Sequence, residues 1–353
     1  MSLRPEVRKE VGGGAALGVP SFHYPPAVPL ALTPTPVEHL ERLSNETGVR
    51  LYAKRDDLTG LALTGNKVRK LEFLLSAAHD SLCDTVITCG GLQSNHARAT
   101  AVAAVKLGLG CRLVLRGTPP ERPEDLAGNL FLDRFVGATV RYITPDEWPR
   151  RDEIMHEEAA TLQQTENRRC YAIPEGGSNA LGAFGYIRCA EEIAQEEARS
   201  GKPFDYVVCA TGSGGTQAGL VAGKALLKRS WRVLGFAVCD DRSYFRNRIQ
   251  GILAVLATEY GLRMPGAEDE VHVLDGYKGP AYGIPTPDDL LAIREAAETE
   301  GLLLDPVYTG KAFHGLLAEI GTGAIPRGSR VLFVHTGGIF GLLARAADFG
   351  LSA

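Results

Sequence analysis

Short runs of valine, isoleucine and leucine alternate with amphipathic or alanine-rich stretches along most of the chain. Short branched apolar runs are typical of buried strands, whereas apolar residues spaced three and four apart are typical of helices. The alternation predicts right-handed βαβ units and therefore an α/β fold with parallel sheets. The predicted strands lie near 50–55 and at Thr85–Cys89, Arg112–Leu115, Val140–Ile143, Cys170–Ile173, Tyr206–Ala210, Arg232–Val238 and Arg330–Val334.

Helices are predicted between most of these strands, for example at His96–Leu107, Thr216–Leu227 and Pro287–Glu300. Thr35-Pro36-Val37-Glu38 has the form of a capping box and predicts a short helix that ends near Ser44. Residues 1–34 are rich in proline and glycine and predict an irregular lead-in. With 353 residues, the chain is longer than one hydrophobic core usually supports, so two domains are expected.

Composition and charge exclude several classes of protein. The net charge of −4 favours neither nucleic acid nor an anionic membrane surface as a partner. The seven cysteines are scattered without a Cys-x-x-Cys pair, which is typical of free thiols in a reducing compartment, so no metal site is expected. No apolar run is long enough to span a membrane, and residues 12–17 are too short and glycine-rich for a signal-peptide core. The expected location is the cytoplasm.

Lys67 stands at the predicted start of a helix. Asn66 before it is of the N-cap type, and apolar residues from Val68 onward recur at helical spacing. The helix dipole, the nearby Arg69 and Lys70, and partial burial all disfavour a charged ammonium, so we expect a lowered pKa for Lys67. Such a lysine suits Schiff-base chemistry, although a single lysine at a helix start is more often simply solvated.

Two glycine-containing segments each follow a predicted strand and open a helix. In the first, Ser94 and Asn95 stand where N-caps belong, and free backbone N–H groups there can bind a carboxylate or a phosphate. An ordinary capped helix explains this segment equally well. The second is Thr211-Gly212-Ser213-Gly214-Gly215-Thr216-Gln217, whose glycines allow a nest of N–H donors for a phosphate. Gln217 replaces the third glycine of Gly-x-Gly-x-x-Gly, which favours a cofactor other than a dinucleotide.

Three C-terminal pieces are further candidates. Tyr308 and Thr309, in Asp305-Pro306-Val307-Tyr308-Thr309, place an aromatic ring beside a hydroxyl. His335-Thr336-Gly337-Gly338 closes the last predicted strand, and Tyr282 lies in a Gly-Ile-Pro turn. Taken singly, each is explained more simply as a core tyrosine or a glycine turn.

Together, these segments resemble the pyridoxal-phosphate-dependent D-cysteine desulfhydrase / 1-aminocyclopropane-1-carboxylate deaminase family. The resemblance runs from about Pro34 to the C-terminus and rests on an ordered set of motifs: Lys-Arg-Asp-Asp, Gly-Asn-Lys-x-Arg-Lys-Leu-Glu, Gln-Ser-Asn, Thr-Gly-Ser-x-x-Thr, Asp-Pro-Val-Tyr and His-Thr-Gly-Gly. It implies a tryptophan-synthase-β-like (type II) fold with two open, twisted parallel-sheet domains. The large, cofactor-binding domain would comprise residues 1–67 and 175–353, and the small α/β domain residues 68–174. It also implies pyridoxal 5'-phosphate in the cleft between them, a small amino-acid substrate and a homodimer.

The resemblance also implies roles for individual residues. Lys67 matches the lysine that forms the internal aldimine, and Asn95 and Tyr308 match the residues on the two faces of the pyridine ring. Ser94, Asn95 and His96 match the clasp for the substrate carboxylate. The implied catalytic residues are Lys67, Ser94, Tyr308 and Tyr282. The other implied cofactor contacts are Asn66, Thr211, Gly212, Ser213, Gly214, Gly215, Thr216, Thr309 and Thr336, of which 212–216 match the phosphate cradle.

Two departures favour one branch of the family. The deaminases have a glutamate at the position of Thr309, facing the pyridine nitrogen, and a glutamine at the position of His96. Both changes resemble the desulfhydrase branch, whereas Ile339-Phe340 replaces the Ala-Pro expected in close desulfhydrases. The predicted reaction is α,β-elimination from a small amino acid, with D-cysteine giving pyruvate, hydrogen sulfide and ammonia. L-cysteate sulfo-lyase activity is the first alternative and 1-aminocyclopropane-1-carboxylate deamination the second.

Two alternatives come from other classes of protein. An NAD-binding oxidoreductase would use Asp240 or Asp241 as the ribose ligand, but the broken glycine spacing disfavours it. A catalytically silent ligand-binding protein is disfavoured by the joint presence of Lys67, Ser94 and Tyr308.

Overall fold

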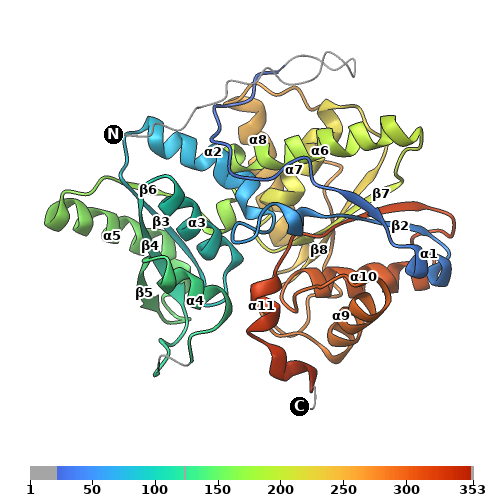
Figure 1. The fold of residues 1–353 in the computed structure, drawn as a ribbon. Helices are drawn as coiled ribbons and strands as arrows, with labels where there is room; N and C mark the ends of the chain where they lie inside the picture. The colour runs from blue at the N-terminus through green and yellow to red at the C-terminus, as the bar shows by residue number, and fades with distance from the viewer. Residues whose placement is uncertain (1–21, 123–124, 351–353) are drawn as a thin grey trace.

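A computed structural model describes residues 22–122 and 125–350 of the chain (Figure 1). The strands are β1 Val37–His39, β2 Arg50–Lys54, β3 Thr85–Gly91, β4 Gly110–Arg116, β5 Thr139–Ile143, β6 Cys170–Ala172, β7 Tyr206–Thr211, β8 Arg232–Ala237, β9 His272–Leu274 and β10 Arg330–Val334. The helices are α1 Glu41–Thr47, α2 Lys67–Asp80, α3 Asn95–Lys106, α4 Gly128–Phe135, α5 Arg151–Glu166, α6 Ala180–Ser200, α7 Gly215–Leu226, α8 Arg242–Thr258, α9 Pro287–Glu300, α10 Thr309–Gly321 and α11 Ile339–Leu343. Short 3-10 turns lie at Asp56–Leu58, Trp148–Arg150, Glu175–Gly177 and Ala346–Phe349.

The strands form two separate sheets. One has six strands in the order β1-β2-β10-β7-β8-β9, and the other has four in the order β5-β4-β3-β6. All pairs are parallel except β1 with β2, which is antiparallel at the edge of the larger sheet. The predicted α/β fold with parallel sheets is confirmed. The smaller sheet is built entirely from strands between 85 and 172, whereas the predicted boundaries at 67 and 175 stay a prediction.

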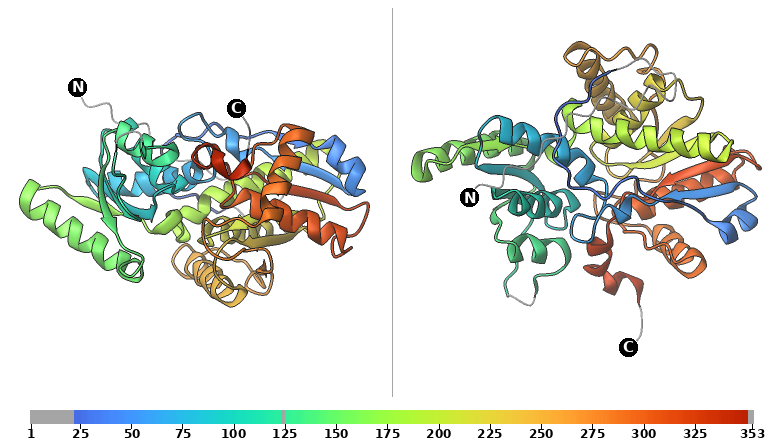
Figure 2. Two further views of the ribbon diagram at one scale, coloured as in Figure 1. Left: turned by 90° about the horizontal axis from the view of Figure 1, so that it is seen from below. Right: turned by 45° about the horizontal axis from the view of Figure 1, so that its top comes forward.

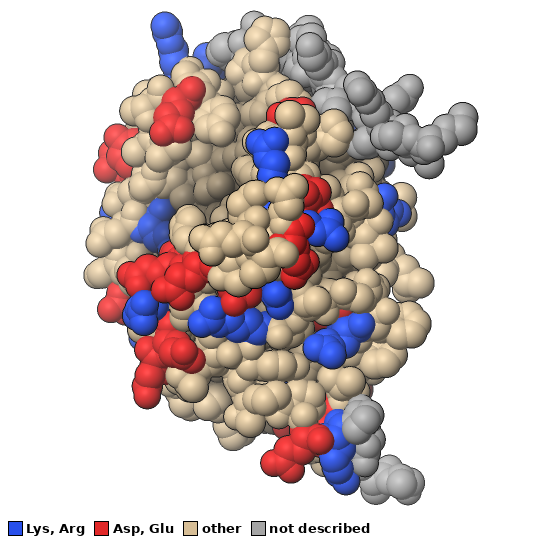
Figure 3. Space-filling view, turned by 90° about the vertical axis from the view of Figure 1, so that its left-hand side faces the viewer, with Lys and Arg blue, Asp and Glu red and all other residues tan. Residues whose placement is uncertain are grey.

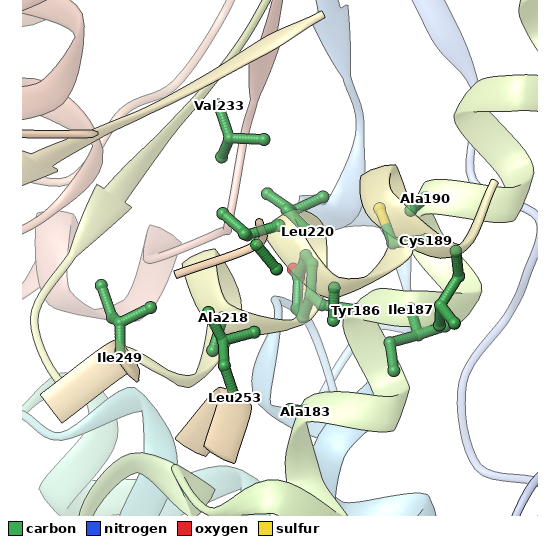
Figure 4. Close-up of a cluster of buried hydrophobic side chains, with 14 of the residues drawn as sticks. Ala183, Tyr186, Ile187, Cys189, Ala190, Ala218, Leu220, Val233, Ile249 and Leu253 are labelled. Carbon is green, nitrogen blue, oxygen red and sulfur yellow. The ribbon is translucent and has the colours of Figure 1, made fainter. Parts of the chain in front are cut away.

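Alternate residues of the central strands of the larger sheet face two different cores. Val207 and Cys209 of β7 pack in the cluster that includes α6, α7 and α8, while Val208 and Ala210 pack in the cluster that includes α9 and α10. This follows from the two-residue period of a strand, and both faces of the sheet are therefore covered. Figure 4 shows part of the first cluster, where Val233 of β8 lies over α7 and the side chains of α6.

The helices α6 and α7 pack closely because α7 carries glycines at the contact. A Cβ atom added at Gly219 would lie 2.4 Å from the Cβ of Tyr186, and one at Gly223 would lie 2.3 Å from the Cβ of Ala190. Only glycine allows such an approach between the two helices. The packing fixes the direction of α7, whose N-terminus faces the site described below.

The smaller sheet is also covered on both faces. Val86 packs with α2 and α3, whereas Ile87 and Cys89 pack with α5. In both views of Figure 2 the two sheets lie side by side, with the C-terminal helix α11 at their boundary against α4. Figure 3 views the molecule from the side of the smaller sheet, where acidic and basic side chains lie interspersed.

The local predictions hold for most elements but fail near Thr35. The strand Arg330–Val334 and the helix Pro287–Glu300 have their predicted bounds, and the other predicted strands differ by one or two residues at one or both ends. The predicted helix after Thr35 is wrong, because residues 37–39 form β1 and the helix begins only at Glu41. The Thr35 hydroxyl donates to Asp56 instead of capping a helix. Strand β9, of three residues, was not predicted.

Part of the predicted irregular lead-in, residues 1–21, lies outside the described residues. Within 22–122 and 125–350, no helix has both the length and the apolar character needed to cross a membrane. In the same part of the chain, no three His, Cys, Asp or Glu side chains are grouped so that they could hold a metal ion.

Candidate active site

Two adjoining cavities lie where strand ends of the two sheets meet. The larger has a volume of about 470 Å³, and its walls include Gly90 near the end of β3, Ser94 after β3, Gly212 after β7 and Asp240 after β8. The smaller has a volume of about 20 Å³. Four residues line both cavities: Lys67, Gly212, Ser213 and Tyr308. The carboxyl ends of parallel strands are the usual place for ligands in α/β folds.

Lys67 is the first residue of α2 and lies at the junction of the two cavities. Burial lowers the pKa of its amine to about 8, against the opposing effect of the Glu175 carboxylate. The lowered pKa agrees with the sequence prediction, but burial rather than the positive charge of Arg69 is the physical cause. At pH 7 about one tenth of an amine with this pKa is uncharged, compared with well under one thousandth of an ordinary lysine.

Arg69 does not act on Lys67 because it belongs to a buried ion cluster that anchors α2. Its guanidinium donates to both oxygens of Asp56 at 2.9 and 2.8 Å and to Glu192 at 2.7 Å. Tyr186 donates to Asp56 as well, and Lys54 pairs with Glu192. Burial alone would raise the pKa of Asp56, but the charges of Arg69 and Lys54 hold it below its ordinary value. The cluster ties the helix that carries Lys67 to β2 and α6.

Asn66 stands at the N-cap position, but its side chain does not cap the helix, and that part of the prediction is wrong. Its backbone is already helical, and its Nδ2 donates to the hydroxyl of Thr216 at 3.0 Å. Its backbone N–H donates to the carbonyl of Thr336 at 3.1 Å. Asn66 therefore joins the starts of α2 and α7 to the end of β10, and all three residues line the smaller cavity.

The segment Gly212–Thr216 forms the loop before α7 and the first residues of that helix. Gly214 has a φ of +86°, and a Cβ at Gly212 would lie 2.9 Å from the Tyr308 ring. These positions require glycine, and they bring the N–H groups of the first helical turn to the cavity wall. Most of the loop lines the smaller cavity: Thr211, Gly212, Ser213, Gly214 and Thr216. Gly215 is buried and is not part of the wall.

The Lys70 amine, the Arg248 guanidinium and hydroxyl groups surround this loop. The Lys70 amine donates to Ser178 Oγ at 3.1 Å, and Ser178 Oγ lies 2.8 Å from Ser213 Oγ. Arg248 donates to the carbonyl of Ser213 at 2.9 Å. A helix start with glycines, hydroxyls and nearby cations has the chemistry of a phosphate cradle. The residues present therefore fit the phosphate of pyridoxal phosphate.

Gln217 explains the missing third glycine of the loop. Its Oε1 accepts from the Thr211 hydroxyl at 2.8 Å, and its Nε2 donates to the carbonyl of His272 at 2.7 Å. The amide occupies the space above Gly235, where an added Cβ would lie 1.9 Å from Oε1. Gln217 thus connects β7 to β9 by hydrogen bonds and packs against β8, below the loop.

Ser94 caps α3, as predicted, because its Oγ accepts from the N–H of Ala97 at 3.1 Å. Ser94 and His96 line the larger cavity and Asn95 the smaller one. The hydroxyl proton of Thr88 goes to the carbonyl of Ile173, so Thr88 accepts from His96 Nε2 at 2.9 Å. Burial and the charges of Lys67 and Lys70 hold the pKa of His96 well below its ordinary value, and His96 is uncharged.

Asn129 fixes the orientation of Asn95 and was not predicted. Its Nδ2 donates to Asn95 Oδ1 at 3.0 Å, and its Oδ1 accepts from Arg98 at 3.2 Å. Because Asn95 Oδ1 is an acceptor here, the amide NH₂ of Asn95 remains the group that can donate to a ligand. Arg98 also donates to the carbonyl of Thr64, three residues before Lys67.

Tyr282 and Tyr308 meet across the larger cavity. Their hydroxyl oxygens lie 2.6 Å apart. Burial raises the pKa of Tyr282 to about 12 and holds that of Tyr308 well above its ordinary value. Thr309 follows Tyr308 but is not among the residues on either wall. Its hydroxyl donates to Asp305 Oδ1 at 2.7 Å and accepts from the Asp305 N–H, so its proton is already used. Its predicted contact with the cofactor stays a prediction.

Sequence reasoning missed most of the outer wall of the larger cavity. This wall includes Arg116, Trp148, Arg151 and Glu175. Within it, Arg151 forms an ion pair with Glu175 at 3.3 Å. One signal was available: Pro174-Glu175-Gly176-Gly177 follows a strand and precedes a helix, as the other site loops do, and both glycines have positive φ. A Cβ at Gly176 would lie 2.3 Å from Ser213 Oγ and 3.4 Å from the Lys67 amine.

Comparisons with known proteins agree with this geometry. The family model described as "Pyridoxal-phosphate dependent enzyme" matches residues 28–337. The chain is 42% identical over 323 residues to a mitochondrial bifunctional D-cysteine desulfhydrase/1-aminocyclopropane-1-carboxylate deaminase of Arabidopsis thaliana, covering 89% of this chain and 78% of that protein. It is 39% identical over 316 residues to a 1-aminocyclopropane-1-carboxylate deaminase of Rhizobium radiobacter, covering 88% and 94% of the two chains. A crystal structure of an ACC deaminase homologue superposes with a TM-score of 0.83 at 39% identity, covering 92% of this chain and 95% of the other.

Proposed function

The chain belongs to the family of pyridoxal-phosphate-dependent enzymes and has their type II fold, and we propose that it eliminates a β-substituent from a small amino acid, with D-cysteine as the first candidate substrate. Pyruvate, hydrogen sulfide and ammonia would be the products. The observation that carries the proposal is the amine of Lys67, whose pKa is lowered to about 8 beside the glycine loop of α7.

Pyridoxal phosphate, when bound, supplies an aldehyde that reacts with amines and a ring that withdraws electrons from Cα. In our proposal the start of α7, with Ser213 and Thr216, holds its phosphate. The NH₂ group of Asn95, oriented by Asn129, is available for an oxygen of the ring. Tyr308 lies on the wall shared by both cavities and is placed to pack against the ring.

Lys67 is the proposed general base. Its uncharged amine takes the Cα proton, and the electrons of the C–H bond form a double bond between Cα and Cβ as the bond from Cβ to sulfur breaks. The sulfur departs with the bonding pair, and water then releases pyruvate and ammonia. The hydroxyl of Ser94 and the N–H groups at the start of α3 hold the substrate carboxylate in this proposal.

The tyrosine pair is the proposed source of a proton for the leaving group. Because burial raises the pKa of both hydroxyls, Tyr282 and Tyr308 stay protonated at neutral pH. The 2.6 Å contact uses only one of the two protons, and the other is free to be donated into the cavity.

Opening of 1-aminocyclopropane-1-carboxylate is the second candidate, because two of the relatives carry that activity in their names. We place it second because of Thr309, which stands where the deaminases have a glutamate. The Thr309 hydroxyl already donates its proton to Asp305, so it is a weaker partner for a ring nitrogen than a glutamate would be. Parallel keto-acid assays with D-cysteine, β-chloro-D-alanine, L-cysteate and the cyclopropane test the choice. Pyruvate from the β-substituted substrates supports elimination, whereas turnover of the cyclopropane alone contradicts it.

A further inference from the structure

Arg116 is the last residue of β4 and lies beside Gly91 at the carboxyl edge of the smaller sheet. Its guanidinium carbon lies 4.8 Å from the centre of the Trp148 ring and 5.4 Å from that of Tyr282. All three residues line the larger cavity. Tyr282 follows β9 of the larger sheet, whereas Arg116 belongs to the smaller sheet. The contact between them therefore joins the two parts of the protein that carry the two sheets.

The guanidinium of Arg116 differs from that of its neighbour Arg151. Arg151 pairs with Glu175 at 3.3 Å and donates to the carbonyl of Trp148. No described carboxylate lies within ion-pair distance of Arg116, and no described acceptor receives a hydrogen bond from its side chain. The aromatic rings attract the cation and hold its position, but they do not use its five N–H donors. Arg116 therefore presents a fixed planar set of donors in the wall of the cavity.

The surroundings favour an anion at this place. His96 is uncharged, and the charge of Glu175 is balanced by its pairing with Arg151. Arg116 also contacts Tyr282, one of the two hydroxyls proposed to serve the leaving group, rather than the amine of Lys67. A guanidinium matches the oxygens of a carboxylate or a sulfonate in a two-point contact.

We infer that Arg116 forms a second anion subsite, which receives an acidic β-substituent of the substrate. This inference rests on the proposed elimination and narrows its substrate class to amino acids whose β-substituent carries negative charge or leaves with it. The sulfur of cysteine is one such group, and a β-sulfonate is another, with oxygens for a two-point contact. In the reaction of the sulfonate, Lys67 takes the Cα proton, the bond between Cβ and sulfur breaks, and sulfur leaves with the electron pair as sulfite. No oxidant or reductant is needed. The fixed charge of Arg116 stabilises the negative charge that the leaving group carries away.

A kinetic comparison of two substrates tests the subsite. For holoenzyme, we compare kcat/KM for cysteate with that for β-chloroalanine of the same enantiomer, in wild type and in Arg116→Met. Methionine keeps contact with the aromatic rings but removes the charge. We expect the ratio of the two kcat/KM values to fall by ~10-fold or more in Arg116→Met, and by less in Arg116→Lys. The matched control is Arg199→Met, which lies on α6 with 75% of its side chain exposed and should leave the ratio unchanged. An unchanged ratio in Arg116→Met would show that Arg116 only packs or binds the α-carboxylate, and would overturn the inference.

A binding measurement separates this inference from the proposed function. Calorimetric titration of the holoenzyme with 3-sulfopropanoate and with propanoate needs no turnover. We expect the sulfonate to bind ~10-fold or more tightly than propanoate to wild type, and the preference to disappear in Arg116→Met. Equal affinities in wild type would overturn the subsite even if elimination is observed. Failure of every amino acid to give a keto acid would refute the elimination, and the titration would still decide the role of Arg116.

Discussion

The hydroxyl oxygens of Tyr282 and Tyr308 lie 2.6 Å apart, with their rings edge to face at an interplanar angle of 72°. Tyr282 comes from the turn after β9 and Tyr308 immediately precedes α10, so the pair forms only in the folded protein. Both hydroxyls stay protonated at neutral pH, and the pair places a proton donor in the wall of the cavity that Lys67 also lines.

Removing one hydroxyl of this pair should slow turnover more than it weakens substrate binding. General acids contribute roughly 10²–10⁴-fold to rate, so we expect kcat to fall within that range in Tyr282→Phe or Tyr308→Phe. The ring contacts remain in phenylalanine, and cofactor content should stay at the wild-type level. Steady-state kinetics with D-cysteine and absorbance of the bound cofactor measure both effects. A rise in KM at constant kcat in both variants would mean that the pair only shapes the cavity.

The lowered pKa of Lys67 predicts how the apoenzyme takes up its cofactor at different pH values. Only the uncharged amine reacts with an aldehyde, and the folded protein holds the pKa of this amine at about 8. The rate of reconstitution should therefore rise with pH up to about 8 and level off above it, falling about tenfold for each pH unit below. Stopped-flow absorbance after mixing apoenzyme with pyridoxal phosphate records this profile. A profile that continues to rise to pH 10 would indicate an ordinary, solvated lysine.

Asn129 should affect the cofactor through Asn95, which it orients. In Asn129→Leu, Asn95 loses the donor to its Oδ1 and becomes free to flip its amide, and Arg98 loses an acceptor. A flipped Asn95 would no longer donate to the cofactor and would leave that polar group unpaired. This loss costs about 1–3 kcal/mol and would weaken pyridoxal phosphate binding by roughly 5–150-fold. Equilibrium titration of apoenzyme measures the affinity. The control is Asn247→Leu, a similar change at an exposed position of α8 that should leave the affinity unchanged.

A negative charge on the loop before α7 should weaken binding of the phosphate of pyridoxal phosphate. Gly214 has a φ of +86° and lines the smaller cavity, so Gly214→Asp adds strain, bulk and a negative charge at the proposed cradle. We expect cofactor affinity to fall by ~100-fold or more. Gly251→Asp adds the same side chain on α8, where nothing lies within 4 Å of the new Cβ, and serves as the matched control. Equal affinities in the two variants would place the phosphate elsewhere.

The sequence alone predicts features that depend on neighbouring residues along the chain. Strand β10, the cap that Ser94 places on α3 and the glycine loop before α7 are local patterns, and the structure contains each of them. The helix predicted after Thr35 fails because the Thr35 hydroxyl bonds to Asp56, a contact made by the tertiary fold. Asn66 fails as a cap for the same reason, since its amide bonds to Thr216, 150 positions along the chain.

The unpredicted residues of the site share one property: their neighbours come from other strands and helices. Arg116 and Glu175 reach the cavity because β4 and β6 flank β3 in the smaller sheet. Asn129 acts on Asn95 because α4 lies against α3. Strand order cannot be read from the hydrophobic pattern of a single chain, so these contacts require the structure.

The attachment of the cofactor tests the central claim most directly. Borohydride fixes the bond between pyridoxal phosphate and its lysine, and mass spectrometry of the digested protein then identifies the modified residue. We expect one pyridoxyl group on Lys67 and loss of the yellow colour on reduction. In Lys67→Ala we expect no pyridoxyl group on the protein after reduction, because its cofactor is not bonded to a lysine and can be removed by dialysis. A pyridoxyl group on Lys54 or Lys70 of the wild-type protein, or no modified lysine at all, would contradict this account of the site.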